Sequence, residues 1–121
     1  MPDRRRSGNT GEDAVCAFLE RNGYVILCRN YTVRGGEIDI IAEKDGVIAF
    51  VEVKLRKEGA LVTGEEAVNR SKRKHLIYAA ERYMLGAGEG KCGRFDVAAV
   101  EVKKDGRMSL KYYVSAFDAS K

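Results

Sequence analysis

Hydrophobic and polar positions repeat with two different periods along the chain, and these periods divide it into helices and strands. Apolar residues recur at helical spacing in two segments, one ended by a single glycine and the other by a glycine-rich stretch. The other apolar runs are short and rich in β-branched and aromatic residues, as is typical of strands. We therefore expect helices at residues 11–22 and 65–85, and strands at 24–31, 37–43, 47–55, 95–102 and 109–117.

The order of these elements, α-β-β-β-α-β-β, predicts an α/β fold with a mixed sheet of about five strands flanked by helices. Asp45-Gly46, between the second and third strands, is a strong hairpin signal. The third strand is almost entirely apolar, which favours a central position buried on both faces. We expect residues 1–9 to form a basic flexible tail and residues 10–121 to form a single domain.

Charged residues interrupt two of the apolar strands. Asp39 lies in the second strand, and Glu52 and Lys54 lie in the third, each between apolar neighbours. An unpaired buried charge is costly, so a partner must offset that cost. One interpretation is a ladder of ion pairs on a solvent-exposed face, and the other is a functional site. The apolar residues around Glu52 and Lys54 favour the functional site.

The hairpin makes the second interpretation more specific. If the turn has two residues, Asp39 lies opposite Glu52 and Glu37 lies opposite Lys54, all on one face. Two directly opposed carboxylates repel each other, whereas a hard divalent cation such as Mg²⁺ or Mn²⁺ would bind both. A lysine beside such a cation can orient water or stabilise the negative charge that develops during phosphodiester hydrolysis.

The charge of the chain mildly favours a polyanionic partner, since the net charge is +4 and the pI is about 9.0. Phosphate contacts would set the affinity for DNA and its salt dependence rather than the choice of sequence. The alternatives are a solvated helix face and a solubilising tail. The candidate DNA-contacting residues are Arg4, Arg5 and Arg6 in the tail, and Lys72 and Arg73 in the second helix.

Several classes of protein are disfavoured by the composition. Cys16, Cys28 and Cys92 have no metal-binding spacing, which predicts reduced thiols and a cytoplasmic location. We expect no signal peptide and no membrane span, because the N-terminus is charged and no apolar run is long enough. His75 is the only histidine, which excludes a paired-histidine ribonuclease mechanism.

Several separated motifs occur in a recognisable order between residues 9 and 102. They are Gly11-Glu12 with Ala14, Gly23-Tyr24, Arg29-Asn30-Tyr31, GEIDII at 36–41, FVEVKLR at 50–56, EAV at 66–68 with Lys72, and RFDVAAV at 94–100. In these motifs the chain resembles the YraN-like family of predicted bacterial endonucleases. That family in turn resembles the restriction-endonuclease-like fold and, within it, the archaeal Holliday-junction resolvases.

The resemblance implies a three-layer restriction-endonuclease-like core and a set of site residues. Carried over by motif, the catalytic residues would be Glu12, Asp39, Glu52 and Lys54. The ligands of Mg²⁺ or Mn²⁺ would be Asp39, Glu52 and the backbone carbonyl of Val53. A homodimer is also implied, because resolvases cut two strands symmetrically, and a DNA-processing protein is a further candidate partner.

Three functions remain open from the sequence. The first is a metal-dependent endonuclease that hydrolyses DNA, with branched DNA among its candidate substrates. The second is a non-cleaving module that binds DNA or a partner protein on a nuclease scaffold, and the third is an adaptor whose acids are structural. The costly charges of Asp39, Glu52 and Lys54 favour the enzyme. Glu12 is also explained by the helix dipole, and we expect Asp96 to be a structural acceptor.

Overall fold

The helices and strands of the computed structural model follow the predicted order, and residues 10–59 and 70–117 are the ones that it describes. The predicted tail at residues 1–9 and the first part of the predicted second helix, residues 65–69, lie outside the described residues. The elements are α2 (Thr10–Arg21), β1 (Val25–Val33), β2 (Gly36–Lys44), β3 (Val47–Lys57), α3 (Arg70–Gly86), β4 (Cys92–Val102) and β5 (Met108–Phe117).

All five of these strands form one mixed sheet in the order β1-β2-β3-β4-β5. Neighbouring strands are antiparallel, except that β3 and β4 are parallel. The chain between them contains α3, because parallel neighbours need a long crossover. β3 is central and buried from residue 48 to residue 52, as predicted. One boundary was wrong: the fourth strand was expected to begin at residue 95, but β4 begins at Cys92, which pairs with Val47 of β3.

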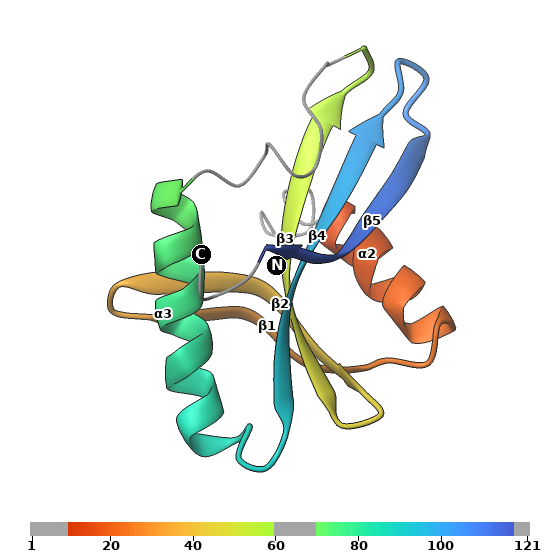
Figure 1. The fold of residues 1–121 in the computed structure, drawn as a ribbon. Coiled ribbons are helices and arrows are strands. Elements are labelled where there is room, and N and C mark those ends of the chain that lie inside the picture. The colour runs from red at the N-terminus through yellow and green to blue at the C-terminus, as the bar shows by residue number, and fades with distance from the viewer. Residues whose placement is uncertain (1–9, 60–69, 118–121) are drawn as a thin grey trace, which may run out of the picture.

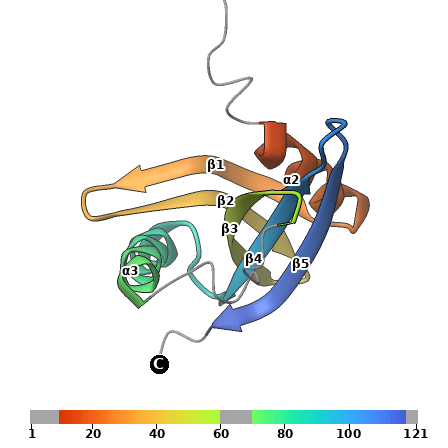
Figure 2. The ribbon, with the colours of Figure 1, turned by 90° about the horizontal axis from the view of Figure 1, so that it is seen from above.

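The two helices cover opposite faces of the sheet, so the protein has the predicted three-layer α/β arrangement (Figures 1 and 2). Helix α2 ends at Arg21. Gly23, two residues further on, has a φ of 90°, and the backbone N–H of Tyr24 donates to the carbonyl of Leu19 at 3.0 Å, which closes the end of the helix. In the described part of the chain, neither helix is long and apolar enough to cross a membrane.

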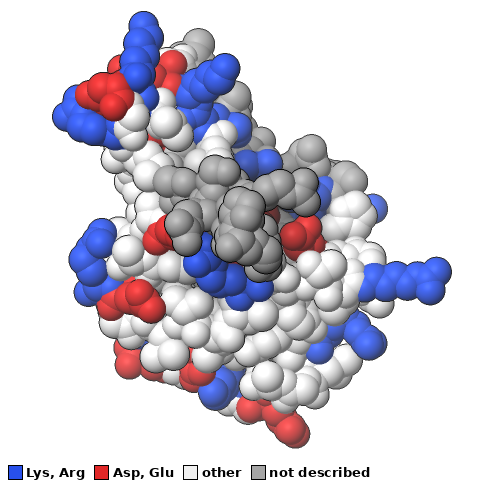
Figure 3. Space-filling model, turned by 180° about the vertical axis from the view of Figure 1, so that it is seen from behind, with Lys and Arg blue, Asp and Glu red and all other residues white. Residues whose placement is uncertain are grey.

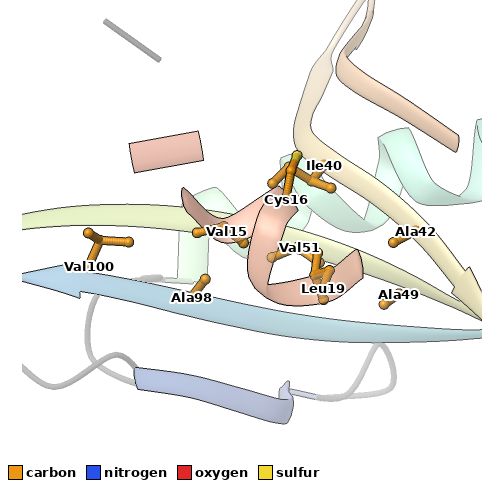
Figure 4. Close-up of a cluster of buried hydrophobic side chains, with 9 residues drawn as sticks. All are labelled: Val15, Cys16, Leu19, Ile40, Ala42, Ala49, Val51, Ala98 and Val100. Carbon is orange, nitrogen blue, oxygen red and sulfur yellow. The ribbon is translucent and has the colours of Figure 1, made fainter. Parts of the chain in front are cut away.

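Each face of the sheet has its own hydrophobic core. The core under α2, drawn in Figure 4, consists of Val15, Cys16, Leu19, Ile40, Ala42, Ala49, Val51, Ala98 and Val100. The core under α3 consists of Ile38, Ile41, Ile48, Phe50, Leu76, Ala79, Ala80 and Val97.

Gly36 brings the start of β2 unusually close to the backbone of α3. A Cβ atom at this position would overlap the backbone carbonyl oxygen of His75 and lie 3.0 Å from the Cβ of Ala79. Only glycine therefore allows this approach. The contact fixes the first turns of α3 beside β2, and Lys72 lies one turn before His75.

The hairpin between β2 and β3 has the predicted two-residue turn. Asp45 and Gly46 have φ angles of 52° and 79°, and Lys44 pairs with Val47. Positive φ at both central residues is the mark of a type I′ turn. The predicted register of the hairpin is confirmed as far as its last pair, Ile40 with Val51.

Beyond that last pair the two strands separate and leave a fork in the sheet. The first part of β2 pairs only with β1, whose Asn30 has a φ of 55°, while β3 continues beside β4 to Lys57. In Figure 1 the β1–β2 hairpin turns towards α3, whereas β3 and β4 run on together in another direction. The first residues beyond this last pair are Asp39, which precedes Ile40 on β2, and Glu52, which follows Val51 on β3.

Candidate metal centre

Asp39 and Glu52 lie at the base of the fork, one on each separating strand. The backbone N–H of Val53 donates to Oδ2 of Asp39 at 2.8 Å, so the aspartate side chain reaches across to β3. The side chain of Glu52 is only 4% exposed. The register thus brings these two carboxylates together. The predicted opposition of Glu37 and Lys54 is wrong, because the ladder ends before it reaches them and Glu37 pairs with Thr32 of β1.

The two carboxylates interact strongly in the metal-free protein. Burial, followed by the charge and hydrogen bonding of Glu52, raises the pKa of Asp39 to about 6. The hydrogen bond from Val53 acts in the opposite direction but is the smaller influence. The repulsion between these two carboxylates is relieved when they share a proton or a cation.

Two lysines approach Glu52 from different elements. The Nζ of Lys72, in the first turn of α3, lies 2.8 Å from Oε2 of Glu52, and the Nζ of Lys54 lies 3.8 Å from the same atom. The hydrogen bond to Glu52 is the largest cause of a raised pKa at Lys72. Lys72 was predicted as a phosphate contact on a helix surface, but the structure places it on a candidate metal ligand.

Glu12, which the family resemblance implied as a site residue, lies in the first turn of α2 and interacts electrostatically with Asp39. Its side chain is 15% exposed, and burial followed by the charge of Asp39 raises its pKa. The guanidinium of Arg29 lies 3.5 Å from Glu12 and 2.9 Å from Asp13. Sequence reasoning assigned no role to Arg29, although it stands in the Arg29-Asn30-Tyr31 motif that contributed to the resemblance.

A groove of about 490 Å³ runs between the β1–β2 hairpin and α3. Its lining includes Thr32, Gly36 and Glu37 from the hairpin and Lys72 and His75 from α3. Neither Asp39 nor Glu52 lines the groove. Lys72 connects the groove to the acid pair, because it lines the groove and its Nζ also contacts Glu52.

The other predicted DNA contacts are Arg73 and three arginines of the predicted tail. The guanidinium of Arg73 lies over the ring of Phe117 at 5.3 Å from its centroid, and Arg4, Arg5 and Arg6 lie outside the described residues. On the face drawn in Figure 3, lysine and arginine side chains are scattered among acidic ones and broad uncharged areas. The described residues on this face therefore do not form one continuous basic surface.

Asp96 belongs to a separate buried cluster on β4 and β5. Its fully buried carboxylate accepts hydrogen bonds from Arg94, from the hydroxyl of Tyr112 at 2.6 Å and from the backbone N–H of Ser115 at 2.9 Å. The pairing of β4 with β5 shifts register between Phe95 and Val97, and Ser115 has a φ of 54°. The hydrogen bond from Ser115 to Asp96 stabilises this irregular part of the sheet. All these partners are structural, which agrees with the predicted role of Asp96 as an acceptor.

The chemistry of the donor set suits a hard divalent cation. Mg²⁺ is usually held by one or two carboxylates, with water and substrate phosphates as further ligands. Asp39 and Glu52 supply that number, and their mutual repulsion would be relieved by a cation between them. No group of three or more His, Cys, Asp or Glu side chains is placed to hold a metal within residues 10–59 and 70–117. The remaining ligands would have to be backbone oxygen, water or substrate.

Fold and site together define a small three-layer α/β protein, consistent with a nuclease-like core, that has an acid pair and lysines at a fork in its sheet. Residues 11–100 match the model of the uncharacterised protein family UPF0102. The chain belongs to this family, which is the YraN-like family that its motifs predicted.

Relatives in distant bacteria share almost the whole chain. A UPF0102 protein of Symbiobacterium thermophilum is 44% identical over 95% of this chain and 98% of its own length. The corresponding proteins of Myxococcus xanthus and Chlorobium phaeobacteroides are 37% and 40% identical, each over 97% of this chain and over 93% and 97% of their own lengths. These matches establish the family, and their names assign it no activity.

Proposed function

We propose that this protein is a metal-dependent endonuclease that hydrolyses DNA phosphodiester bonds, with branched DNA as its candidate substrate. The observation that carries the proposal is the acid pair at the fork between β2 and β3, with a half-buried Asp39, a buried Glu52 and the Nζ of Lys54 3.8 Å from Glu52. Such an arrangement is costly in a purely structural protein, because burial and the charge of Glu52 raise the pKa of Asp39.

Each residue at the fork has a role in this proposal. Asp39, Glu52 and the carbonyl of Val53 would hold Mg²⁺ or Mn²⁺, which would lower the pKa of a bound water and offset charge at phosphorus. Lys54 orients the attacking water or stabilises the negative charge of the transition state. Glu12 lies close enough to Asp39 for the charge of Asp39 to raise the pKa of Glu12, and Arg29 holds Glu12 in place.

The geometry around the acids supports a large, charged substrate. The groove between the β1–β2 hairpin and α3 is lined in part by Lys72, which also contacts Glu52. A phosphodiester chain is the kind of substrate that needs both an extended groove and a nearby cation. Symmetric cutting of branched DNA would require a two-fold dimer, and a DNA-processing protein could direct the dimer to its substrate.

A non-cleaving module that binds DNA or a partner protein is the second candidate. The observation that favours it is the ion pair of Lys72 with Glu52, which already neutralises one carboxylate. A second observation also favours the binding module: within the described residues, no third acid, histidine or cysteine is placed to complete a metal site. A binding module would use the groove and have no need of a cation.

Incubation of the purified protein with linear, flap and four-way-junction DNA separates the two candidates. We expect cutting in Mg²⁺ or Mn²⁺ and none in EDTA, because the acid pair needs a cation to act on a phosphodiester. Preferential cutting of the junction would support the branched-DNA assignment. If none of the substrates is cut although salt-sensitive DNA binding is present, the endonuclease proposal fails and the binding module is favoured.

A further inference from the structure

We propose that Lys72 is a displaceable internal counter-ion of the metal centre, which holds Glu52 until a divalent cation takes its place and then moves to a phosphate of the substrate. The inference deepens the proposed function and depends on it, because it assumes that Asp39 and Glu52 bind a metal. It differs from the sequence prediction, in which Lys72 was only a contact on the helix surface.

The distances make simultaneous occupancy unfavourable. The Nζ of Lys72 lies 2.8 Å from Oε2 of Glu52, and Mg²⁺ binds carboxylate oxygens at about 2.0–2.1 Å. A divalent cation on the same oxygen would therefore stand at most about 5 Å from the ammonium group. Like charges at that separation repel each other, and this repulsion favours departure of the ammonium group that is closer to Oε2 and more exposed, which is that of Lys72.

Lys72 is the lysine that can leave without a change in the fold. Its side chain is 45% exposed, whereas that of Lys54 is 24% exposed. The long, flexible side chain projects from the first turn of α3, whose backbone is fixed against β2 by the close contact at Gly36. Rotation of the side chain alone can therefore carry Nζ away from Glu52 while the helix stays in place.

The groove provides the place to which Nζ moves. Lys72 lines the groove, and its Nζ contacts Glu52. A small rotation of the Lys72 side chain would therefore exchange the Glu52 carboxylate for a ligand bound in the groove. A phosphate in the groove would offer the same kind of charge-assisted hydrogen bond. The protein would thus present this positive charge to substrate only when the cation is bound, and the carboxylate would remain paired in its absence.

Titration with Mn²⁺, followed by calorimetry and by the electron paramagnetic resonance signal of unbound Mn²⁺, tests this exchange without any measurement of cleavage. Lys72→Met keeps the length of the side chain and removes the charge, so we expect it to bind Mn²⁺ roughly tenfold more tightly than the wild type. Lys72→Arg restores the charge and should return the affinity to within about threefold of the wild type. Lys74→Met, at an exposed position of the same helix, is the matched control and should not change the affinity.

The outcomes separate this inference from the proposed function. Equal or weaker Mn²⁺ binding by Lys72→Met, with binding lost in Glu52→Gln, would overturn the role of Lys72 and leave the metal site intact. Absence of Mn²⁺ binding by the wild type and by every variant would overturn both. Tighter binding by Lys72→Met, reversed by Lys72→Arg and absent in Lys74→Met, supports the exchange.

Discussion

Glu52→Gln is expected to abolish metal-dependent DNA cleavage, with a loss on the order of 10³-fold or more, while DNA binding is largely retained. Glutamine keeps the size of the side chain and removes the charge that, with Asp39, would hold the cation. Because Glu52 is almost fully buried, its carboxylate cannot be replaced by a neighbouring surface acid. Lys54→Ala should give a loss of about 10²–10⁴-fold, since it removes the group that orients water or stabilises charge.

The measurement is the cleavage rate of the best DNA substrate in Mg²⁺ or Mn²⁺, with affinity measured in parallel by fluorescence anisotropy. Glu20→Gln removes one negative charge at an exposed position of α2 and serves as the matched control, with an unchanged rate. Circular dichroism confirms that each variant is folded. Cutting at the wild-type rate by Glu52→Gln or by Lys54→Ala would contradict the assigned chemistry.

Asp39→Asn is expected to stabilise the metal-free protein at neutral pH, by up to roughly 3 kcal/mol. The pKa of Asp39 is raised from an ordinary value of 3.8 to about 6, so the folded state binds a proton more tightly than the unfolded chain does. The contribution of Asp39 to the free energy of unfolding is therefore greatest below about pH 4 and is lost as the pH rises through about 6. Asparagine carries no charge and can still accept the hydrogen bond from Val53.

Denaturant unfolding in EDTA across pH 3.5–8 tests this prediction. The advantage of Asp39→Asn should be near zero at the acid end, grow between about pH 4 and 6, and stay constant above that range. Asp105→Asn, which removes an exposed partner of Arg107, should change stability by about 1 kcal/mol at most. A loss of stability in Asp39→Asn at pH 8 would show that the carboxylate is a structural anchor and not a strained functional group.

The hairpin is the part of the site that the sequence predicted best. A two-residue turn at Asp45-Gly46 permits one register, and that register places Asp39 and Glu52 side by side at the end of the ladder. Local turn chemistry was enough to bring two acids together because no distant part of the chain can alter the pairing of so short a connection. The point at which the strands separate was not predictable, since it depends on tertiary packing such as the close approach of α3 to β2 at Gly36.

Buried acids that look alike in the sequence proved to have different surroundings. Glu52 and Asp96 both interrupt apolar strands, yet Asp96 is surrounded by donors from Arg94, Tyr112 and Ser115. Removal of one partner from a buried pair of this kind typically costs about 3–5 kcal/mol, which suits a structural anchor. Glu52 instead lies beside another acid, Asp39, as well as beside two lysines. Only the three-dimensional arrangement distinguishes the two cases, because the partners come from other strands.

The position of Lys72 was likewise set by tertiary packing. Periodicity predicted a helix that contains it, and its charge suggested a role in phosphate binding. Its distance of 2.8 Å from Glu52 depends on how closely α3 approaches β2, which the glycine at position 36 permits. The glycine was visible in the GEIDII motif, but the helix backbone that it contacts comes from a distant segment of the chain.

The most direct test of the account is the location of a bound cation. Crystals soaked in Mn²⁺ should show an anomalous peak between Asp39 and Glu52, with carboxylate oxygens from both at about 2.0–2.2 Å and the carbonyl of Val53 as a further ligand. The same soak of Asp39→Asn or Glu52→Gln crystals should leave that position without a peak. A wild-type crystal with Mn²⁺ bound only elsewhere, or with none bound at saturating concentration, would contradict the claim that this fork is a metal centre.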